Sequence, residues 1–270
     1  MNEIISKTTL VDAITVLEIY APQVALKAEP GQFVAVRAIK GAREIPFPIM
    51  DDCKEKGTLT ILCKAVDEDT VQLSRLRQGE RIDGLAGPLG LPSRLDHLRR
   101  AVVVAGGMGC AKAFPIAKKL HTLGTEVHSL LGFRRKDRVM MEEDFRRVSD
   151  QLIITTNDGS YGKKGLVTVA LEAVLKKDNY DAAFAMGPLF MMKAVSELTK
   201  RYHTRTVVSI NPAIVDSTSL CPHEGGRLFK TENDMPVYCV GFECDGHRID
   251  FDEAIRRDKT THYMNAVSEK

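Results

Sequence analysis

The spacing of apolar positions divides the chain near residue 98. Before that point, short β-branched and apolar runs are separated by turn signals such as Pro30-Gly31 and Gln78-Gly79. Runs of this length and spacing are typical of an antiparallel β-barrel, although a β-sandwich fits them too. We therefore expect a barrel over residues 1–97, with strands in ITVLEIYA (14–21), QFVAVRAI (32–39), LTILCKAV (59–66) and RIDGLAGP (81–88).

From residue 101, apolar strands alternate with helical stretches. AVVVAGG (101–107) has the character of a buried strand with a glycine turn, and the helical stretch CAKAFPIAKKLHTLG follows it. The alternation continues as far as TRTVVSI (204–210) and implies a doubly wound parallel sheet. We assign this α/β domain to residues 98–208. Beyond it the sequence is rich in turn residues, and residues 209–270 are expected to form a small appended module.

Composition narrows the class of protein. The 270 residues are 44% apolar and 27% charged with a formal charge of +2, which gives no reason to expect a nucleic-acid partner. No apolar run approaches the ~18 residues of a membrane span, and the start MNEIISK lacks signal-peptide character. We expect a cytoplasmic protein with no membrane partner. Thiols stay reduced in that compartment, so the clustered Cys221, Cys239 and Cys244 favour metal binding over disulfides.

Three predicted strand ends carry residues that suit a nucleotide. A glycine turn between a strand and a helix lets the backbone approach a pyrophosphate at the helix N-terminus. The carboxyl ends of parallel strands meet at one edge of the sheet, so these turns are expected to form one crevice for a nicotinamide nucleotide. Asp158 can accept a hydrogen bond from the nucleotide there, or can serve only an Asx-turn. The residues of this predicted site are Gly106, Gly107, Gly109, Asp158, Gly187 and Pro188.

Several segments, in this order, resemble the ferredoxin–NADP reductase superfamily. The similarity is greatest to electron-transfer subunits related to that of dihydroorotate dehydrogenase, including the small subunit of NADH-dependent ferredoxin–NADP oxidoreductase, also called a sulfide dehydrogenase subunit. The resemblance implies an FAD-binding barrel, an NAD(P)-binding α/β domain and a C-terminal loop with a 2Fe–2S cluster. It rests on GPLG (87–90), VVVAGGMGCAKAFPIAKKL (102–120), TTNDGSYGKKGLVT (155–168), GPLFMMKAVSELTK (187–200) and SINPAIVDSTSLC (209–221).

The resemblance implies an FAD site with several departures from the family pattern. Glu44 stands where the family has an arginine, with Arg43 displaced by one position, and Pro48 stands where a hydroxyl faces the flavin. Asp67-Glu68-Asp69-Thr70 replaces a Gly-x-Gly-Thr turn, and its carboxylates disfavour a diphosphate. The residues implied at this site are Arg43, Pro46, Phe47, Pro48, Leu62, Cys63, Lys64, Thr70, Gly87 and Gly90.

The residues implied for nucleotide binding match the family pattern better than those implied for the flavin. The glycines of the predicted nucleotide site match the family. Lys112 replaces a family proline in the first helical turn, where an ammonium can reach a phosphate. Arg134 and Arg135 follow the second strand, where an NADP enzyme would hold a 2′-phosphate. The family branch favours NADH, so the choice between NADH and NADPH stays open.

The metal loop is also altered. Asp216, Cys221 and Cys239 match the family's ligand positions, Glu224 stands where a thiolate is expected, and Cys244 is additional. The resemblance implies a 2Fe–2S cluster completed by Cys244 or Glu224, since thiolates and a carboxylate both hold iron. Zinc held by Cys221, His223, Cys239 and Cys244 is one alternative. A loop without metal is the other.

These expectations describe an electron-transfer subunit that acts with a partner. Electrons would pass between NAD(P)H, FAD and the 2Fe–2S centre, and to or from a larger flavoprotein with iron–sulfur clusters, which could serve ferredoxin in turn. No protein acid or base is expected, because hydride transfer depends on proximity and orientation. The alternative is a non-catalytic scaffold or regulatory subunit with a degenerate flavin site and a zinc-bound or empty loop.

Overall fold

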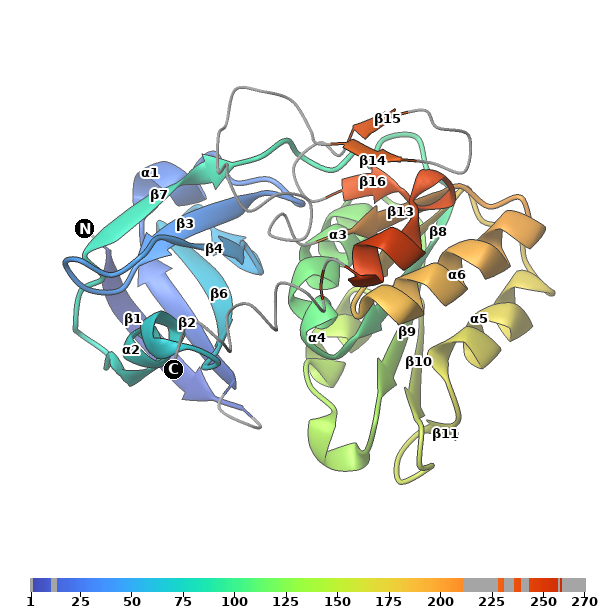
Figure 1. Cartoon of the computed structure of the whole chain (residues 1–270), viewed down its shortest axis with the longest axis horizontal. Helices are drawn as coiled ribbons and strands as arrows, with labels where there is room; N and C mark the ends of the chain where they lie inside the picture. Colours follow the sequence, from blue (N-terminus) through green and yellow to red (C-terminus); the bar gives the residue numbers. More distant parts are fainter. Residues whose placement is uncertain are drawn as a thin grey trace. The chain divides into compact units, whose positions relative to one another are not determined.

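A computed structural model of the chain describes residues 2–10, 14–210, 228–230, 236–238, 243–256 and 258 (Figure 1). The chain forms two compact units. Unit 1 comprises Met1–Arg94 and Phe114–Ile116, and unit 2 comprises Leu95–Ala113 and Ala117–Lys270. Within the described ranges, no helix has the length and apolarity needed to cross a membrane.

Unit 1 contains two antiparallel sheets, one of order β1-β2-β6-β5 and one of order β4-β3-β7. The chain passes from one sheet to the other directly after β4. There Ile49 N–H donates to the Gln32 carbonyl and Met50 N–H donates to the Thr60 carbonyl. The elements are β1 (Glu3–Thr9), β2 (Ile14–Tyr20), α1 (Pro22–Ala25), β3 (Phe33–Arg37), β4 (Ile45–Pro48), β5 (Asp51–Cys53), β6 (Thr58–Lys64), α2 (Glu68–Arg75) and β7 (Gly84–Leu89).

The two sheets of unit 1 share one apolar core. Leu17 and Ile61 come from the first sheet and Val34 and Phe47 from the second, and all four belong to one buried cluster. The antiparallel strands predicted for this half of the chain are thus confirmed. Their hydrogen bonds form two sheets packed over a common core.

Unit 2 is built on a sheet of order β11-β10-β9-β8-β12-β13-β16, in which only β16 runs antiparallel to its neighbour. Every residue from Ala101 to Ala105 in β8 is fully buried, because helices cover both faces of a parallel sheet. This confirms the predicted parallel α/β sheet. The elements are β8 (Arg100–Gly106), η1 (Gly107–Gly109), α3 (Cys110–Thr122), β9 (Glu126–Phe133), η2 (Lys136–Arg138), α4 (Glu142–Arg147), β10 (Gln151–Thr156), β11 (Lys163–Lys164), α5 (Val167–Leu175), β12 (Ala182–Met186), α6 (Leu189–Arg201), β13 (Thr206–Ser209), β14 (Leu228–Lys230), β15 (Pro236–Tyr238), β16 (Glu243–Asp245) and η3 (Gly246–Arg248).

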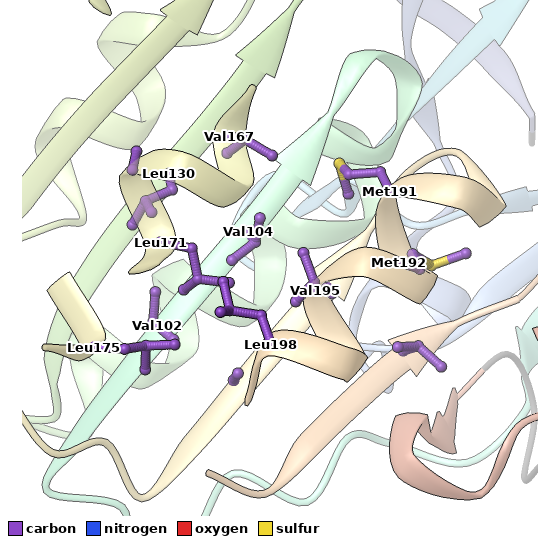
Figure 2. Packing of buried hydrophobic residues seen from close by; sticks show 14 of the residues in the cluster. Val102, Val104, Leu130, Val167, Leu171, Leu175, Met191, Met192, Val195 and Leu198 are labelled. Atoms are coloured by element: carbon purple, nitrogen blue, oxygen red, sulfur yellow. The ribbon is translucent and has the colours of Figure 1, made fainter. Parts of the chain in front are cut away.

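The core of unit 2 explains why α5 and α6 lie side by side. Figure 2 shows Leu171 and Leu175 of α5 and Val195 of α6 gathered around Val102 and Val104 of β8. Alternate residues of a strand face the same side of a sheet, so Val102 and Val104 meet the same pair of helices. The two helices therefore cover the same face of the sheet.

The described part of the predicted C-terminal module, which begins at residue 209, packs into unit 2. β16 pairs with β13, and Cys244 lies opposite Val208. Residues 251–256 are helical, and Phe251 belongs with Cys244 to the buried cluster of the parallel sheet. A Cβ added to Gly246 would lie 2.6 Å from Ser196 Oγ on α6, so the chain passes very close to that helix.

Candidate functional site

The glycine turns after β8 and β12 are packed backbone against backbone. A Cβ on Gly109 would lie 2.1 Å from the Met186 carbonyl oxygen and 2.7 Å from the Gly187 nitrogen. Real Cβ atoms do not approach a backbone so closely, so only glycine fits at position 109. The structure therefore brings together two of the three predicted strand ends, as expected for the carboxyl edge of a parallel sheet.

The other glycines of this edge have different surroundings. A Cβ on Gly106 would lie 2.7 Å from Met191 Sδ and 3.3 Å from Pro188 Cδ, so this position is packed against α6. Gly107 has a φ of +54° and no heavy atom within 4 Å of its Cβ position. It therefore faces open space just before the N-terminus of α3, where the helix dipole favours an anion.

Lys112 adds a positive charge to the first turn of α3. The residue is half-buried, and burial of the ammonium lowers its pKa to about 8. The group still carries its charge for most of the time at pH 7. Its position suits the phosphate contact proposed from the sequence.

Asp158 lies on the exposed loop after β10, two strands away from β8 in the sheet. Two strand spacings amount to about 10 Å, a distance that a dinucleotide can span. Asp158 Oδ1 accepts hydrogen bonds from the hydroxyl of Ser160 at 2.6 Å and its amide at 2.9 Å. These bonds hold the pKa of the carboxyl below its usual range and form the Asx-turn considered above.

The loops after β9 and β10 are tied together by contacts that the sequence did not suggest. Lys136 N–H donates to Ser160 Oγ at 2.8 Å, and its ammonium lies 5.6 Å from the centre of the Tyr161 ring. The Tyr161 hydroxyl donates to the Glu142 carboxylate. Arg134 is exposed beside this junction, whereas Arg135 pairs with Asp137 at 2.7 Å. Their proposed role toward a 2′-phosphate stays a prediction.

In unit 1, the predicted flavin strand β4 has few hydrogen-bond donors. Pro46 and Pro48 pair with Ala35 and Phe33 of β3, and neither proline has an N–H. Glu44, which replaces the family's arginine, lies 3.1 Å from the Arg37 guanidinium. Its charge is therefore paired with a cation of unit 1 at the surface.

The first turn of α2 is closed by the chain's own side chains. Asp67 is the N-cap residue, and its Oδ1 accepts from the Thr70 amide at 2.9 Å. The Thr70 hydroxyl accepts from the Asp67 amide at 2.9 Å, which completes a capping box. Arg43 Nε donates to Asp69 Oδ2 at 2.7 Å, and its Nη2 lies 3.3 Å from Asp67 Oδ2.

These contacts keep Asp67 ionised. Burial would raise its pKa, but the hydrogen bonds from Thr70 and the charge of Arg43 outweigh it and hold the pKa below its usual range. The helix start that would receive the FAD diphosphate thus carries negative charge of its own. The residues present do not fit a diphosphate there, and we assign no step to FAD in this chain.

The remaining flavin positions divide into two groups. Leu62, Cys63 and Lys64 end β6, and Cys63 Sγ lies 3.7 Å from the Thr70 carbonyl at the start of α2. Burial raises the pKa of the Cys63 thiol to about 12, so the thiol is neutral. The other group is Gly87 in β7 with Gly90 just after it, and a Cβ on Gly87 would lie 2.8 Å from Val34 Cγ1 of β3.

Most of the predicted metal loop lies outside the described residues. This holds for Asp216, Cys221 and Cys239, and for the alternative ligands His223 and Glu224. Cys244 is buried in β16. The described residues contain no group of three or more His, Cys, Asp or Glu side chains able to hold a metal ion. The metal centre stays a prediction.

Comparison with known proteins places the chain among electron-transfer subunits. No family model matches it. An uncharacterized protein from the adh 3′ region of Clostridium beijerinckii is 37% identical over 95% of this chain and 89% of that protein. The homolog of the dihydroorotate dehydrogenase B (NAD(+)) electron transfer subunit in Thermotoga maritima is 34% identical, over 95% of this chain and 90% of its own length.

A solved structure agrees with these relatives. The structure of NADH-dependent reduced ferredoxin–NADP oxidoreductase, reported in connection with flavin-based electron bifurcation, has a TM-score of 0.83 and 32% identity to this chain. The match covers 95% of this chain and 92% of that one. The chain therefore belongs to the family of dihydroorotate dehydrogenase B-type electron-transfer subunits, which are oxidoreductase subunits of the ferredoxin–NADP reductase superfamily.

Proposed function

We propose that this chain exchanges electrons between NAD(P)H, bound at the carboxyl edge of the unit 2 sheet, and a larger partner subunit. The observation that carries the proposal is the contact of Gly109 with Met186 and Gly187, which leaves Gly107 facing open space at the start of α3. That arrangement lets a pyrophosphate approach the backbone amides of the helix. The partner is proposed because the relatives are named as subunits.

The hydride of NAD(P)H would be accepted by a flavin, and the chain's contribution to this transfer is positioning. The reaction needs no protein acid or base once the nicotinamide is held in the right geometry. The amides at the start of α3 and the charge of Lys112 would hold the phosphates. The loop at Asp158, fixed by Ser160, would define the far side of the site.

For the C-terminal loop we propose a 2Fe–2S centre held by Asp216, Cys221 and Cys239, with Cys244 or Glu224 as the fourth ligand. The ligand types suit ferric iron. Zinc is the alternative occupant of such a thiolate set. The larger partner would be a flavoprotein with iron–sulfur clusters, and ferredoxin would be reached through it.

Metal content distinguishes these occupants. Protein purified without oxygen is expected to contain about two iron atoms and about two acid-labile sulfides per chain, with a broad visible absorption band. Exchange of Cys244 for Ser should reduce both contents together while NADH binding persists. Stoichiometric zinc without sulfide would show that the loop holds zinc rather than a cluster. The absence of both iron and zinc would show that the loop holds no metal.

Gly107 supplies a test of nucleotide binding with a matched control. Its φ of +54° is tolerated by both Asn and Asp, and no atom lies within 4 Å of the Cβ position. Gly107→Asp places a carboxylate where the pyrophosphate would lie, whereas Gly107→Asn adds a side chain of the same size without charge. We expect Gly107→Asp to weaken NADH or NADPH binding at least about tenfold relative to Gly107→Asn, measured by isothermal titration calorimetry. Equal affinities in the two variants would place the nucleotide elsewhere.

A further inference from the structure

We infer that unit 1 rejects the diphosphate of FAD at the start of α2, so that FAD binds no more tightly than riboflavin, and that Asp67 and Asp69 are responsible. The inference takes a flavin as the ligand of unit 1, as the resemblance to the ferredoxin–NADP reductase superfamily implies, and rests on the proposed function only in that respect. It concerns which part of the flavin molecule the chain can hold. Four observations around α2 and β4 support it.

The first observation is that the amide at this helix start is already used. Asp67 Oδ1 accepts from the Thr70 amide at 2.9 Å and from the Thr70 hydroxyl at 2.6 Å. A helix N-terminus attracts an anion through such amides. Here the side-chain carboxylate occupies the position that a phosphate oxygen would need, and the reciprocal bond from the Asp67 amide to Thr70 Oγ1 holds it in place.

The second observation is the accumulation of negative charge. Asp67, Glu68 and Asp69 are consecutive, and the latter two belong to the first turn of α2. A diphosphate brought to this turn would add its charges to three carboxylates within a few ångströms. Like charges at such distances repel strongly, and more so where water is displaced.

The third observation is that Arg43 is committed to these carboxylates. Its guanidinium donates to Asp69 at 2.7 Å and lies 3.3 Å from Asp67. The side chain is 73% exposed, so it has room to turn. If it turned to a diphosphate, Asp67 and Asp69 would lose the cation that separates their charges. One arginine cannot match both the acids and the ligand.

The fourth observation is that β4 offers no replacement. Glu44, the residue before β4, engages Arg37, which also donates to Asp83 at 2.7 Å. Arg37 is therefore held between two carboxylates that lie just before strands of its own sheet. Pro48 cannot donate from its backbone or its side chain.

The experiment replaces the two charges without removing the cap. Asn is as good an N-cap as Asp, so Asp67→Asn/Asp69→Asn keeps the start of α2 and removes only the charge. The control variant Glu55→Gln/Asp96→Asn removes two exposed carboxylates elsewhere. Riboflavin and FAD are titrated separately against each purified protein, and binding is followed by quenching of flavin fluorescence. Riboflavin shares the ring with FAD and lacks the diphosphate.

We expect the wild-type chain to show the same affinity for FAD and riboflavin within about threefold. The α2 variant should bind FAD at least about tenfold more tightly, with riboflavin unchanged and the control variant like wild type. If the wild-type chain binds no flavin detectably, FAD binding gained by the α2 variant alone supports the inference. Wild-type FAD binding more than about threefold tighter than riboflavin binding would overturn it, as would an α2 variant with no gain for FAD.

NADH binding is measured on the same preparations. It depends on unit 2 and should be equal in all three proteins. If none of the three proteins bound NADH, the proposed function would be contradicted. The ratio of FAD affinity to riboflavin affinity would still test the inference about unit 1. Thermal melts of each variant show that α2 and its unit remain folded.

Discussion

Gly109→Ala is expected to lower the free energy of unfolding by about 3 kcal/mol and to abolish NAD(P)H binding. The added Cβ would lie 2.1 Å from the Met186 carbonyl oxygen, so the turns after β8 and β12 would have to move apart. These contacts are with backbone, which cannot rotate out of the way as a side chain can. Urea denaturation followed by circular dichroism gives the stability, and calorimetric titration with NADH gives the binding.

A substitution at another glycine of the same unit serves as the control. Gly124 has a φ of +79° and no atom within 4 Å of its Cβ position. Asn tolerates this conformation, so Gly124→Asn should change the free energy of unfolding by less than about 1 kcal/mol and leave NADH binding intact. Equal stability losses in the two variants would show that close approach at Gly109 is not what makes glycine necessary there.

Phe251→Ala is expected to lower the free energy of unfolding by about 3–4 kcal/mol. Phe251 is 6% exposed and belongs to the same buried cluster as Cys244, Ile249 and Ala254. Truncating its ring removes apolar contacts and leaves a cavity between residues 251–256 and the rest of unit 2. The loss should appear in urea denaturation, together with faster proteolysis C-terminal to β13.

Phe190→Ala is the matched control, because Phe190 on α6 is 67% exposed. Removing an exposed ring should change the free energy of unfolding by less than about 0.5 kcal/mol. If Phe251→Ala proved as mild as Phe190→Ala, residues 251–256 would contribute little to the core of unit 2.

The parallel sheet was predictable because burial on both faces leaves a plain mark in the sequence. AVVVA in β8 and AAFAM in β12 are continuous apolar runs, and each is followed by a glycine and a helix. β1 was missed since EIISKTT mixes polar and apolar positions, and its exposed residues outnumber the buried one. β16 has three residues, and its place in the sheet depends on pairing with β13, which no local pattern reveals.

The types of residue in the candidate site could be predicted from the sequence, but the contacts between them could not. The sequence marked the glycine turns at separate strand ends, and the structure shows Gly109 against Gly187. The acids before Thr70 were recognised as unfavourable for a diphosphate. Their capping box with Thr70 is a local feature that the spacing of Asp67 and Thr70 could have indicated, whereas the ion pair between residues 43 and 69 depends on tertiary structure. The link between Tyr161 and Glu142 escaped prediction for the same reason.

The pairing of β16 with β13 has a consequence for how this protein associates with others. A parallel sheet that ended at β13 would present an unpaired row of backbone groups, onto which a strand from another molecule could add. β16 covers that row with three residues, and the opposite margin of the sheet is the two-residue β11 with its exposed lysines. Strands this short and charged discourage sheet-to-sheet aggregation. A partner subunit would therefore be recognised through side chains rather than by extension of this sheet.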